Sequence, residues 1–289
     1  MELNKDTKIL IVGLGVIGGG YAKALSKKGY RVRCITLRQE DIDYALERKM
    51  IEKGSTEPSP ELIGWADLVI SALYPHTFLS WIKENQKYMH PGALLTDVTG
   101  VKGKIVGEVQ SMLRPDVEFI SAHPMAGREK SGVEFSDDEV FHGANYIVTP
   151  TEKNTPEAVS FCKKLGEELG FTRISELSPA EHDEMIAYLS QLTHCIAVLL
   201  MTCNTAPNLE KYTGDSFRDL TRIAKINDAM WTELFISNKD ALLRNIDAFS
   251  DELKSFRTLL ADEKSDEMRA VMRTASERRS LFDKPNAKK

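Results

Sequence analysis

Three glycines near the N-terminus have the spacing of a nucleotide-binding loop. Gly13, Gly15 and Gly18 follow a short aliphatic run and precede a segment with helical periodicity. In that context the first glycine makes a tight turn, the second lets the backbone approach a pyrophosphate, and the third lets the helix pack on the strand. The N-terminus of the helix then faces the phosphates. We predict a dinucleotide site formed by Gly13, Leu14, Gly15, Val16, Ile17 and Gly18.

The end of the second predicted strand bears on the choice of dinucleotide. An acidic residue about 20 residues past the loop normally binds the adenosine ribose. This chain has Thr36 there, with Arg38 two residues later. A neutral hydroxyl beside a guanidinium suits a 2′-phosphate, so the sequence favours NADP over NAD. The alternative is that Arg38 is a solvated residue at a helix start and that Glu40 or Asp41 binds the ribose instead.

Histidines supply the candidate acid–base chemistry. His123 follows a predicted strand, at the sheet edge where open α/β folds bind ligands, and a histidine there can accept a proton near neutral pH. Ser190 and His194 are four residues apart in a helical segment, so they share a face. Such a histidine is more often a core residue, although the pair can also point polar groups into a cleft. His123 is the predicted general base.

A third group of residues predicts an anionic ligand. Arg218 and Arg222 are four residues apart on an expected helix, where two like charges repel weakly. Their placement is better explained when an anion lies between them, although Asp219 can supply part of the neutralisation. A solvated basic face is the alternative.

The elements that position these residues change character along the chain. The first 75 residues alternate short aliphatic runs with helical stretches, which is typical of βαβ units and a parallel sheet. Strands are expected at Lys8–Val12, Arg31–Thr36, Leu68–Ala72, Leu94–Val98, Phe119–Ala122, Tyr146–Thr149 and Thr172–Ile174. After Ser178, apolar residues recur at helical spacing. The sequence therefore predicts an α/β protein with a doubly wound Rossmann domain over residues 1–176 and an all-helical domain over residues 177–289.

Composition excludes several other classes. The net charge of −5 over 289 residues argues against a general affinity for nucleic acid. The four cysteines have no CxxC spacing, and the six histidines form neither HExxH nor a Cys/His cluster, so no metal site is predicted. We find no apolar run near the roughly 20 residues that span a membrane, and no secretion signal. We expect a cytoplasmic protein.

Taken in order, the motifs resemble those of the prephenate and arogenate dehydrogenases, oxidoreductases of tyrosine biosynthesis. The motifs are the GLGVIG loop, HPMAGREKSG from His123, EHD at Glu181 to Asp183, SQLTH at Ser190 to His194, and SFRDLTRIA followed by Trp231. The resemblance implies a Rossmann domain followed by a helical dimerisation domain, and a homodimer. It also implies oxidative decarboxylation of prephenate or arogenate with NAD(P) as hydride acceptor.

The resemblance further implies roles for single residues. His123 matches the histidine that accepts the proton of the substrate 4-hydroxyl, and Arg222 matches the arginine that pairs with a substrate carboxylate. Further contacts around the substrate are implied for Ser190, His194, Glu129, Arg218, Asp219 and Trp231, the last near the partner subunit's site. One position departs from the family, which often has a serine before the Val-Lys of its Asp-x-x-Ser-Val-Lys stretch. This chain has Gly100, so either Thr99 substitutes or that contact is missing.

Other functions remain open at this point. A β-hydroxyacid dehydrogenase shares the glycine loop and a helical second domain, but typically uses a lysine base for which we find no supporting motif. A non-catalytic NADP-binding sensor would keep the loop but would not need His123 and Arg222 together. Prephenate and arogenate differ only in a keto versus an amino group, which the sequence does not separate.

Overall fold

A computed structural model describes residues 2–127, 130 and 132–283. The chain forms two compact units, Met1–Lys239 and Asp240–Lys289, and each is described by itself. The first unit holds the sheets and the helices that follow them, and the second holds a helical hairpin. The domain boundary near residue 176 stays a prediction.

The first unit is organised around a six-stranded parallel sheet with the order β3-β2-β1-β4-β5-β6. Its strands are β1 Lys8–Val12, β2 Arg31–Ile35, β3 Lys53–Ser55, β4 Leu68–Ser71, β5 Leu94–Asp97 and β6 Glu118–Phe119. This order confirms the doubly wound α/β fold. The sequence did not predict β3, because the three residues Lys-Gly-Ser contain no apolar side chain.

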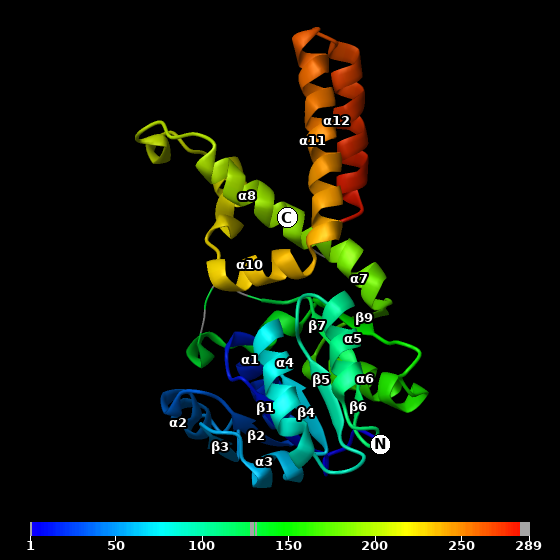
Figure 1. The fold of residues 1–289 in the computed structure, drawn as a ribbon. Coiled ribbons are helices and arrows are strands. Elements are labelled where there is room, and N and C mark those ends of the chain that lie inside the picture. The colour runs from blue at the N-terminus through cyan, green and yellow to red at the C-terminus, as the bar shows by residue number, and fades with distance from the viewer. Residues whose placement is uncertain (1, 128–129, 131, 284–289) are drawn as a thin grey trace. The chain divides into compact units, whose positions relative to one another are not determined.

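Helices cover both faces of this sheet (Figure 1). They are α1 Val16–Lys27, α2 Gln39–Glu47, α3 Pro60–Trp65, α4 Pro75–Asn85, α5 Gly103–Met112 and α6 Pro156–Leu169. Alternate residues of β1 point to opposite faces: Ile9 packs in the core with side chains of α1, α2 and α6, and Leu10 packs in the core with side chains of α3, α4 and α5. The carboxyl ends of the strands are thereby held at one edge.

A second sheet carries the candidate base. Its strands are β7 Ser121–Pro124, β8 Asn145–Thr149 and β9 Arg173–Glu176, with β7 antiparallel and β9 parallel to β8. The single strand expected at Phe119–Ala122 is wrong, because the chain leaves the first sheet after Phe119 and enters the second at Ser121. His123 therefore lies within β7, opposite Ile147, rather than after a strand of the large sheet. An uninterrupted apolar pattern hides this change of sheet.

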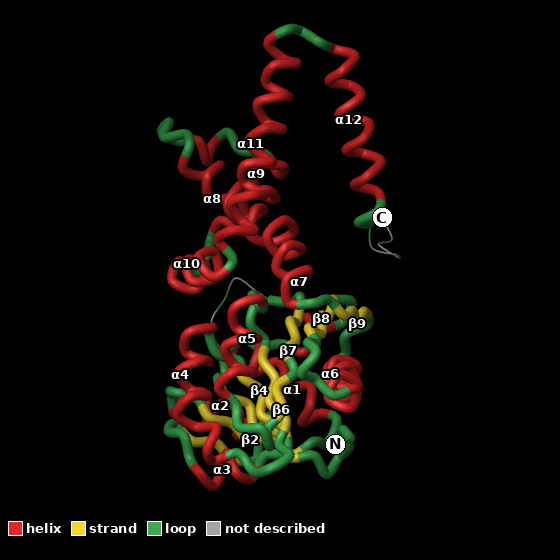
Figure 2. The backbone as a smooth tube through the Cα atoms, turned by 45° about the vertical axis from the view of Figure 1, so that its right-hand side comes forward, coloured by secondary structure: helices red, strands yellow, loops and turns green. Residues whose placement is uncertain are grey.

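Beyond β9 the chain contains only helices and loops among the described residues (Figure 2). The helices of the first unit here are α7 Pro179–Ile186, a π-helical segment at Ala187–Leu192, α8 Thr193–Thr202, α9 Asp215–Thr221 and α10 Asp228–Ser237. Short 3-10 turns occur at Gln86–Tyr88, Val133–Phe135, Asp138–Phe141, Leu209–Lys211 and Arg222–Ala224. As predicted, Ser178 caps α7, in a reciprocal capping box with Glu181, and Pro179 is the first helical residue.

The helix over Pro179–Thr202 corrects one expectation from the sequence. Its 24 residues, with a mean hydropathy of 1.6 over an 18-residue window, are long and apolar enough to cross a membrane. Counting only uninterrupted apolar residues missed this, because Ser190, Gln191 and His194 divide the run. Only 28% of that window is buried within the described chain. Most of its apolar side chains are therefore available for contact with another molecule.

The second unit is a hairpin of α11, which begins at the boundary and spans Lys239–Ala261, and α12 Ser265–Ser280 (Figure 1). Large apolar side chains along both helices are exposed, among them Leu253, Leu260, Val271 and Met272. A hairpin of two helices has too little interior to bury them itself.

Candidate active site

The glycine loop connects β1 to α1 in a conformation that requires its glycines. Gly13 has φ +93°, which side chains rarely adopt, and a Cβ there would lie 2.7 Å from the carbonyl oxygen of Ala72. A Cβ on Gly18 would lie 2.0 Å from the carbonyl oxygen of Gly13, so only glycine lets α1 pack this closely on the strand. A Cβ on Gly15 would meet no atom within 4 Å, which leaves open space beside the loop.

The first turn of α1 is open to an anion. The backbone amides of Val16, Ile17 and Gly18 have no partner within the helix. The N-cap residue, Gly15, has no side chain that could accept a hydrogen bond from them. Helix N-termini of this kind bind phosphate groups. The loop and the helix start therefore fit the pyrophosphate of a dinucleotide.

The end of β2 is tied to the same loop. The backbone amide of Leu14 donates to the Oγ1 of Thr36 at 3.4 Å, and Thr36 is buried. The Arg38 guanidinium lies 3.0 Å from the Oδ1 of Asp41 and 3.9 Å from the Oε2 of Glu40, while 62% of its side chain is exposed. The exposed Arg38 thus pairs with a buried carboxylate, and a phosphate would compete with Asp41 for the guanidinium.

His123 belongs to a chain of three side chains that begins on β7 and continues into α7. The Nδ1 of His123 lies 2.9 Å from the Nε2 of His182, and the Nδ1 of His182 lies 2.8 Å from the Oδ1 of Asp183. His182 is fully buried, and Asp183 is nearly so. The two rings meet edge to face, with centroids 5.1 Å apart.

The start of α5 holds the Asp183 carboxylate in place. The backbone amide of Lys102 donates to its Oδ1 at 2.8 Å, and the amide of Gly103 donates to its Oδ2 at 2.7 Å. A Cβ on Gly103 would lie 2.9 Å from that Oδ2, so a side chain at this position would push the carboxylate away. Each oxygen of the Asp183 carboxylate is thus held by one backbone amide.

A buried ion pair lies behind this chain. Lys102 and Asp97 are both inaccessible to solvent, and their charged groups lie 2.8 Å apart. The same ammonium group donates to the carbonyl oxygen of Ala122, also at 2.8 Å, which anchors the residue before His123. Asp97 additionally accepts hydrogen bonds from the hydroxyl of Ser121 and the backbone amide of Thr99.

These surroundings favour the neutral form of both histidines. Burial, the neighbouring His182 and the Lys102 cation hold the pKa of His123 well below the ordinary histidine value of 6.5. Burial is also the main cause that lowers the pKa of His182, against the opposing effect of the Asp183 carboxylate. A neutral His123 has one ring nitrogen with a free lone pair, which is what a proton acceptor needs.

Gly100 faces the other ring nitrogen of His123. A Cβ at this position would lie 3.8 Å from the Nε2 of His123 and 3.6 Å from Leu234, which is ordinary contact without a clash. Thr99 does not replace the missing serine, because its buried hydroxyl contacts Asp97 and the carbonyl oxygen of Val101. Of the two possibilities left by the sequence, the missing contact is the one that the geometry supports.

The predicted Ser190 and His194 pair occurs at the π-helical segment, a type of distortion frequent at functional sites. The Nδ1 of His194 bonds to the backbone carbonyl of Ser190 at 2.8 Å, so they interact through the backbone rather than through the hydroxyl. The His194 ring stacks on Trp231, with centroids 3.7 Å apart and planes inclined by 29°. His194 and Trp231 thus come together within one chain.

The arginines do not share one continuous helix as expected. Helix α9 ends at Thr221, and Arg222 begins the following 3-10 turn, which packs against α8. Arg218 pairs with Asp215 at 2.9 Å, and Arg218, Asp219 and Arg222 are all exposed in the single chain. Glu129, the remaining predicted substrate contact, lies outside the described residues.

Sequence reasoning missed the residues that support His123. The EHD motif by itself indicates no role for His182 and Asp183, and the Asp-Val-Thr-Gly-Val-Lys stretch draws attention only to its glycine. A usable signal was Asp97 at the end of a buried aliphatic strand, where an unpaired charge is costly, with Lys102 five residues later.

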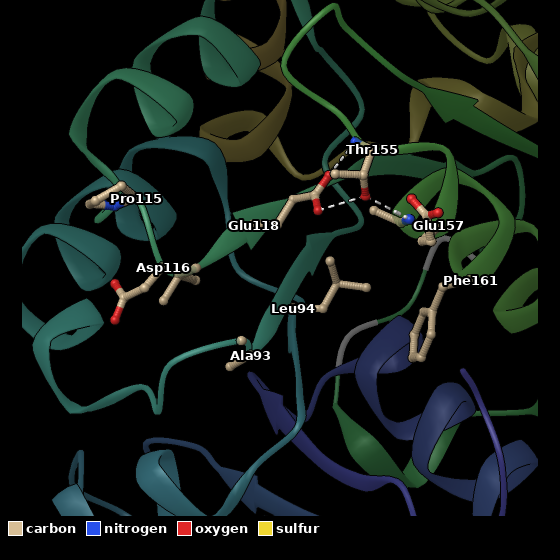
Figure 3. Close-up of a pocket in the computed structure, with 11 residues that line it drawn as sticks. Ala93, Leu94, Pro115, Asp116, Glu118, Thr155, Glu157 and Phe161 are labelled. Atoms are coloured by element: carbon tan, nitrogen blue, oxygen red, sulfur yellow. Dashed lines mark hydrogen bonds between the residues drawn. The ribbon is translucent and has the colours of Figure 1, made fainter. Parts of the chain in front are cut away.

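A hollow at the amino ends of β5 and β6 has a different character (Figure 3). Glu118 points toward the start of α6, where it accepts hydrogen bonds from the amide and the hydroxyl of Thr155 at 2.7 and 2.9 Å. Its carboxylate is therefore used to cap a helix. In parallel sheets ligands bind at the carboxyl ends of the strands, which is where the glycine loop lies, after β1.

Two family models match this chain. Residues 21–174 match the family model described as the prephenate dehydrogenase nucleotide-binding domain, and residues 178–274 match the prephenate dehydrogenase dimerisation domain. The chain belongs to the prephenate dehydrogenase family. Members are NAD(P)-dependent oxidoreductases, and the chain is one of them.

Individual members of the prephenate dehydrogenase family are similar over nearly the whole chain. Prephenate dehydrogenase of Bacillus subtilis is 31% identical over 96% of this chain and 76% of its own length. The crystal structure of prephenate dehydrogenase from A. aeolicus with hydroxyphenyl propionate and NAD+ is 30% identical, covers 98% of this chain and 100% of its own, and has a TM-score of 0.90. Synechocystis arogenate dehydrogenase is 25% identical over 96% of this chain and 100% of its own, with a TM-score of 0.82.

Proposed function

We propose that this chain catalyses the oxidative decarboxylation of prephenate to 4-hydroxyphenylpyruvate, with His123 as the general base. The observation that carries the proposal is the hydrogen bond of His123 to the buried His182, in surroundings that lower the pKa of His123, in a chain that belongs to the prephenate dehydrogenase family. The assignment favours this reaction over that of a lysine-dependent hydroxyacid dehydrogenase and over a sensor without catalysis. Arogenate, which differs in one side-chain group, is the alternative substrate.

In this reaction the substrate loses a hydride from ring C4 and its ring carboxylate as CO2. The proton of the 4-hydroxyl leaves as the hydride departs and returns to the same oxygen when loss of CO2 makes the ring aromatic. The nicotinamide ring, when bound, accepts the hydride. His123 takes the hydroxyl proton on Nε2, which lets the C4–O bond gain double-bond character as the hydride leaves. Arg222 neutralises a substrate carboxylate, and Ser190, His194, Arg218, Asp219, Glu129 and Trp231 are proposed to surround the substrate.

One kinetic grid tests this function. Purified protein is mixed with prephenate or arogenate and with NAD or NADP, and reduced nicotinamide and CO2 are measured together. We expect both products in equal amounts from prephenate. Reduction only with arogenate would assign the alternative substrate, and no reduction with either would reject a dehydrogenase acting on this class of substrate.

Replacing Arg222 with alanine should weaken catalysis through the substrate. A charge-assisted contact to a carboxylate is lost while the glycine loop is unchanged. We expect kcat/KM to fall at least roughly 30-fold, which corresponds to a loss of about 2 kcal/mol of transition-state stabilisation. The cofactor Kd should stay almost unchanged. Arg222→Lys should recover only part of the loss, because an ammonium lacks the planar fork. Arg173→Ala, at an exposed position on β9, is the control, and equal weakening of substrate and cofactor binding would instead indicate a structural role.

We propose a preference for NADP over NAD. Thr36 follows β2 in place of a carboxylate, and Arg38, at the N-cap of α2, has an exposed guanidinium that can pair with a 2′-phosphate. Because Asp41 competes for Arg38, the expected preference in kcat/KM is modest, roughly 10-fold. The Thr36→Asp, Arg38→Ala double variant should reverse it. Equal kcat/KM with both cofactors in the wild type would contradict the proposal.

We propose that the chain is a homodimer in the cytoplasm. Support comes from the match to a dimerisation domain over residues 178–274, the poorly buried run Pro179–Thr202 and the exposed apolar residues of α11 and α12. A second copy that covers these surfaces makes a membrane unnecessary for them. Sedimentation at micromolar concentration should give twice the mass of one chain. A fully active monomer, or protein recovered only with membranes, would contradict this.

A further inference from the structure

The hydrogen bonds behind His123 determine where its proton lies. The Asp183 carboxylate has only acceptors to offer, so the Nδ1 of His182 must carry the proton of their 2.8 Å contact. A neutral His182 then has its lone pair on Nε2, which faces His123 at 2.9 Å. The Nδ1 of His123 must therefore donate, and its Nε2 is left with the free lone pair.

The backbone makes this order of donors and acceptors difficult to reverse. Both oxygens of Asp183 accept amide N–H groups from the start of α5, so the carboxylate cannot turn away from His182 without losing one of them. Burial keeps His182 neutral at physiological pH, as the order requires. A backbone-fixed carboxylate thus fixes the tautomer of a ring two hydrogen bonds away.

His123 has a single anchor among the described residues. Its one hydrogen bond there is the contact of Nδ1 with His182, and on the Nε2 side Gly100 offers no hydroxyl. The space beside Gly100 is large enough for a serine Cβ at 3.8 Å from Nε2. In this chain the orientation of the ring therefore depends on the Nδ1 side.

We propose that His182 and Asp183 are positioning residues that hold His123 with its proton on Nδ1 and its lone pair on Nε2, and that the chain depends on them because Gly100 provides no second anchor. The proposal rests on the proposed role of His123 as the base. Neither residue needs to touch the substrate, so both act through kcat rather than through KM.

The direct test is the tautomer of His123 in the protein without substrate. Nitrogen NMR of protein labelled at its six histidines distinguishes a protonated from an unprotonated ring nitrogen, and His123→Asn identifies the signals of His123. We expect the proton on Nδ1 in the wild type. A wild-type His123 with its proton on Nε2 would overturn the proposal. Because this measurement needs no turnover, it stands whether or not prephenate is the substrate.

Variants at residue 182 separate positioning from packing. His182→Gln keeps an acceptor oxygen near the place of Nε2, whereas His182→Phe keeps a ring without an acceptor. We expect His182→Phe to lower kcat by roughly 10- to 100-fold, the usual effect of losing such a supporting contact, with KM almost unchanged and the His123 proton no longer confined to Nδ1. His182→Gln should recover most of kcat. His90→Gln is the matched control, because His90 is a histidine near the amino end of β5, away from the Asp97 end.

Gly100→Ser tests the dependence on a single anchor. A serine hydroxyl that donates to Nε2 favours the same tautomer from the other side of the ring. The kcat loss caused by His182→Phe should therefore be smaller in the Gly100→Ser background, by about 3-fold or more, as expected for coupled sites. Equal losses in both backgrounds, or a His182→Phe variant with wild-type kcat and tautomer, would overturn the proposal.

Discussion

Replacing His123 with asparagine should lower kcat by about 10²- to 10⁴-fold, the usual contribution of a positioned base. Asparagine keeps a polar side chain of similar reach toward His182 but has no lone pair that takes up a proton near neutral pH. The glycine loop follows β1 of the six-stranded sheet, whereas His123 lies on β7 of the second sheet, so the cofactor Kd should stay at its wild-type value. Stopped-flow reduction of the nicotinamide with saturating substrate measures the chemical step, and a kcat within a few-fold of wild type would remove His123 from the mechanism.

The pH dependence of kcat/KM in the wild type and in His123→Asn provides a second control. Only neutral His123 accepts a proton, and burial, His182 and Lys102 all lower its pKa. As pH falls, wild-type kcat/KM should therefore persist through the ordinary histidine pKa of about 6.5 and decline only below it. The residual activity of His123→Asn should lack this acid limb. An unchanged limb in the variant would assign it to another group.

Much of the first unit could be predicted because its elements are determined locally. The aliphatic run of β1, the glycines that follow it and the Ser178-Pro179 start of α7 each depend on neighbours in sequence. Strand β3 was missed because Lys-Gly-Ser pairs with β2 without an apolar side chain of its own. The division between β6 and β7 was missed because both short strands have buried residues.

The candidate site also contains residues that the local sequence indicates and residues that only long-range contacts identify. His123 was proposed from its residue type and from a strand expected to end before it, whereas the structure places it within β7. The importance of His182 comes from a partner 59 positions away, and that of Asp183 from amides 80 and 81 positions away, which no local pattern indicates. Lys102 is a fully buried lysine, the opposite of what its residue type predicts. Long-range polar contacts of this kind require the fold to be known first.

Replacing Lys102 with methionine should have the largest effect on stability. Methionine fills a similar volume but leaves the Asp97 carboxylate buried without its cation, and it removes the hydrogen bond to the carbonyl of Ala122. Breaking a buried ion pair from one side costs about 3 to 5 kcal/mol, a large share of the 5 to 15 kcal/mol that stabilises a typical domain. The hydroxyl of Ser121 still donates to Asp97, which places the expected loss near 3 kcal/mol.

Urea unfolding measures this loss, and two further variants identify its cause. Lys104→Met, two residues away on the exposed side of α5, should keep the wild-type midpoint, because its contact with Glu108 is solvent-exposed. Asp97→Asn combined with Lys102→Met should recover part of the stability, since no lone buried charge remains. Lys102→Met should also move the acid limb of kcat/KM to higher pH, because the Lys102 cation no longer lowers the pKa of His123. A midpoint equal to that of Lys104→Met would show that the pair contributes nothing to stability.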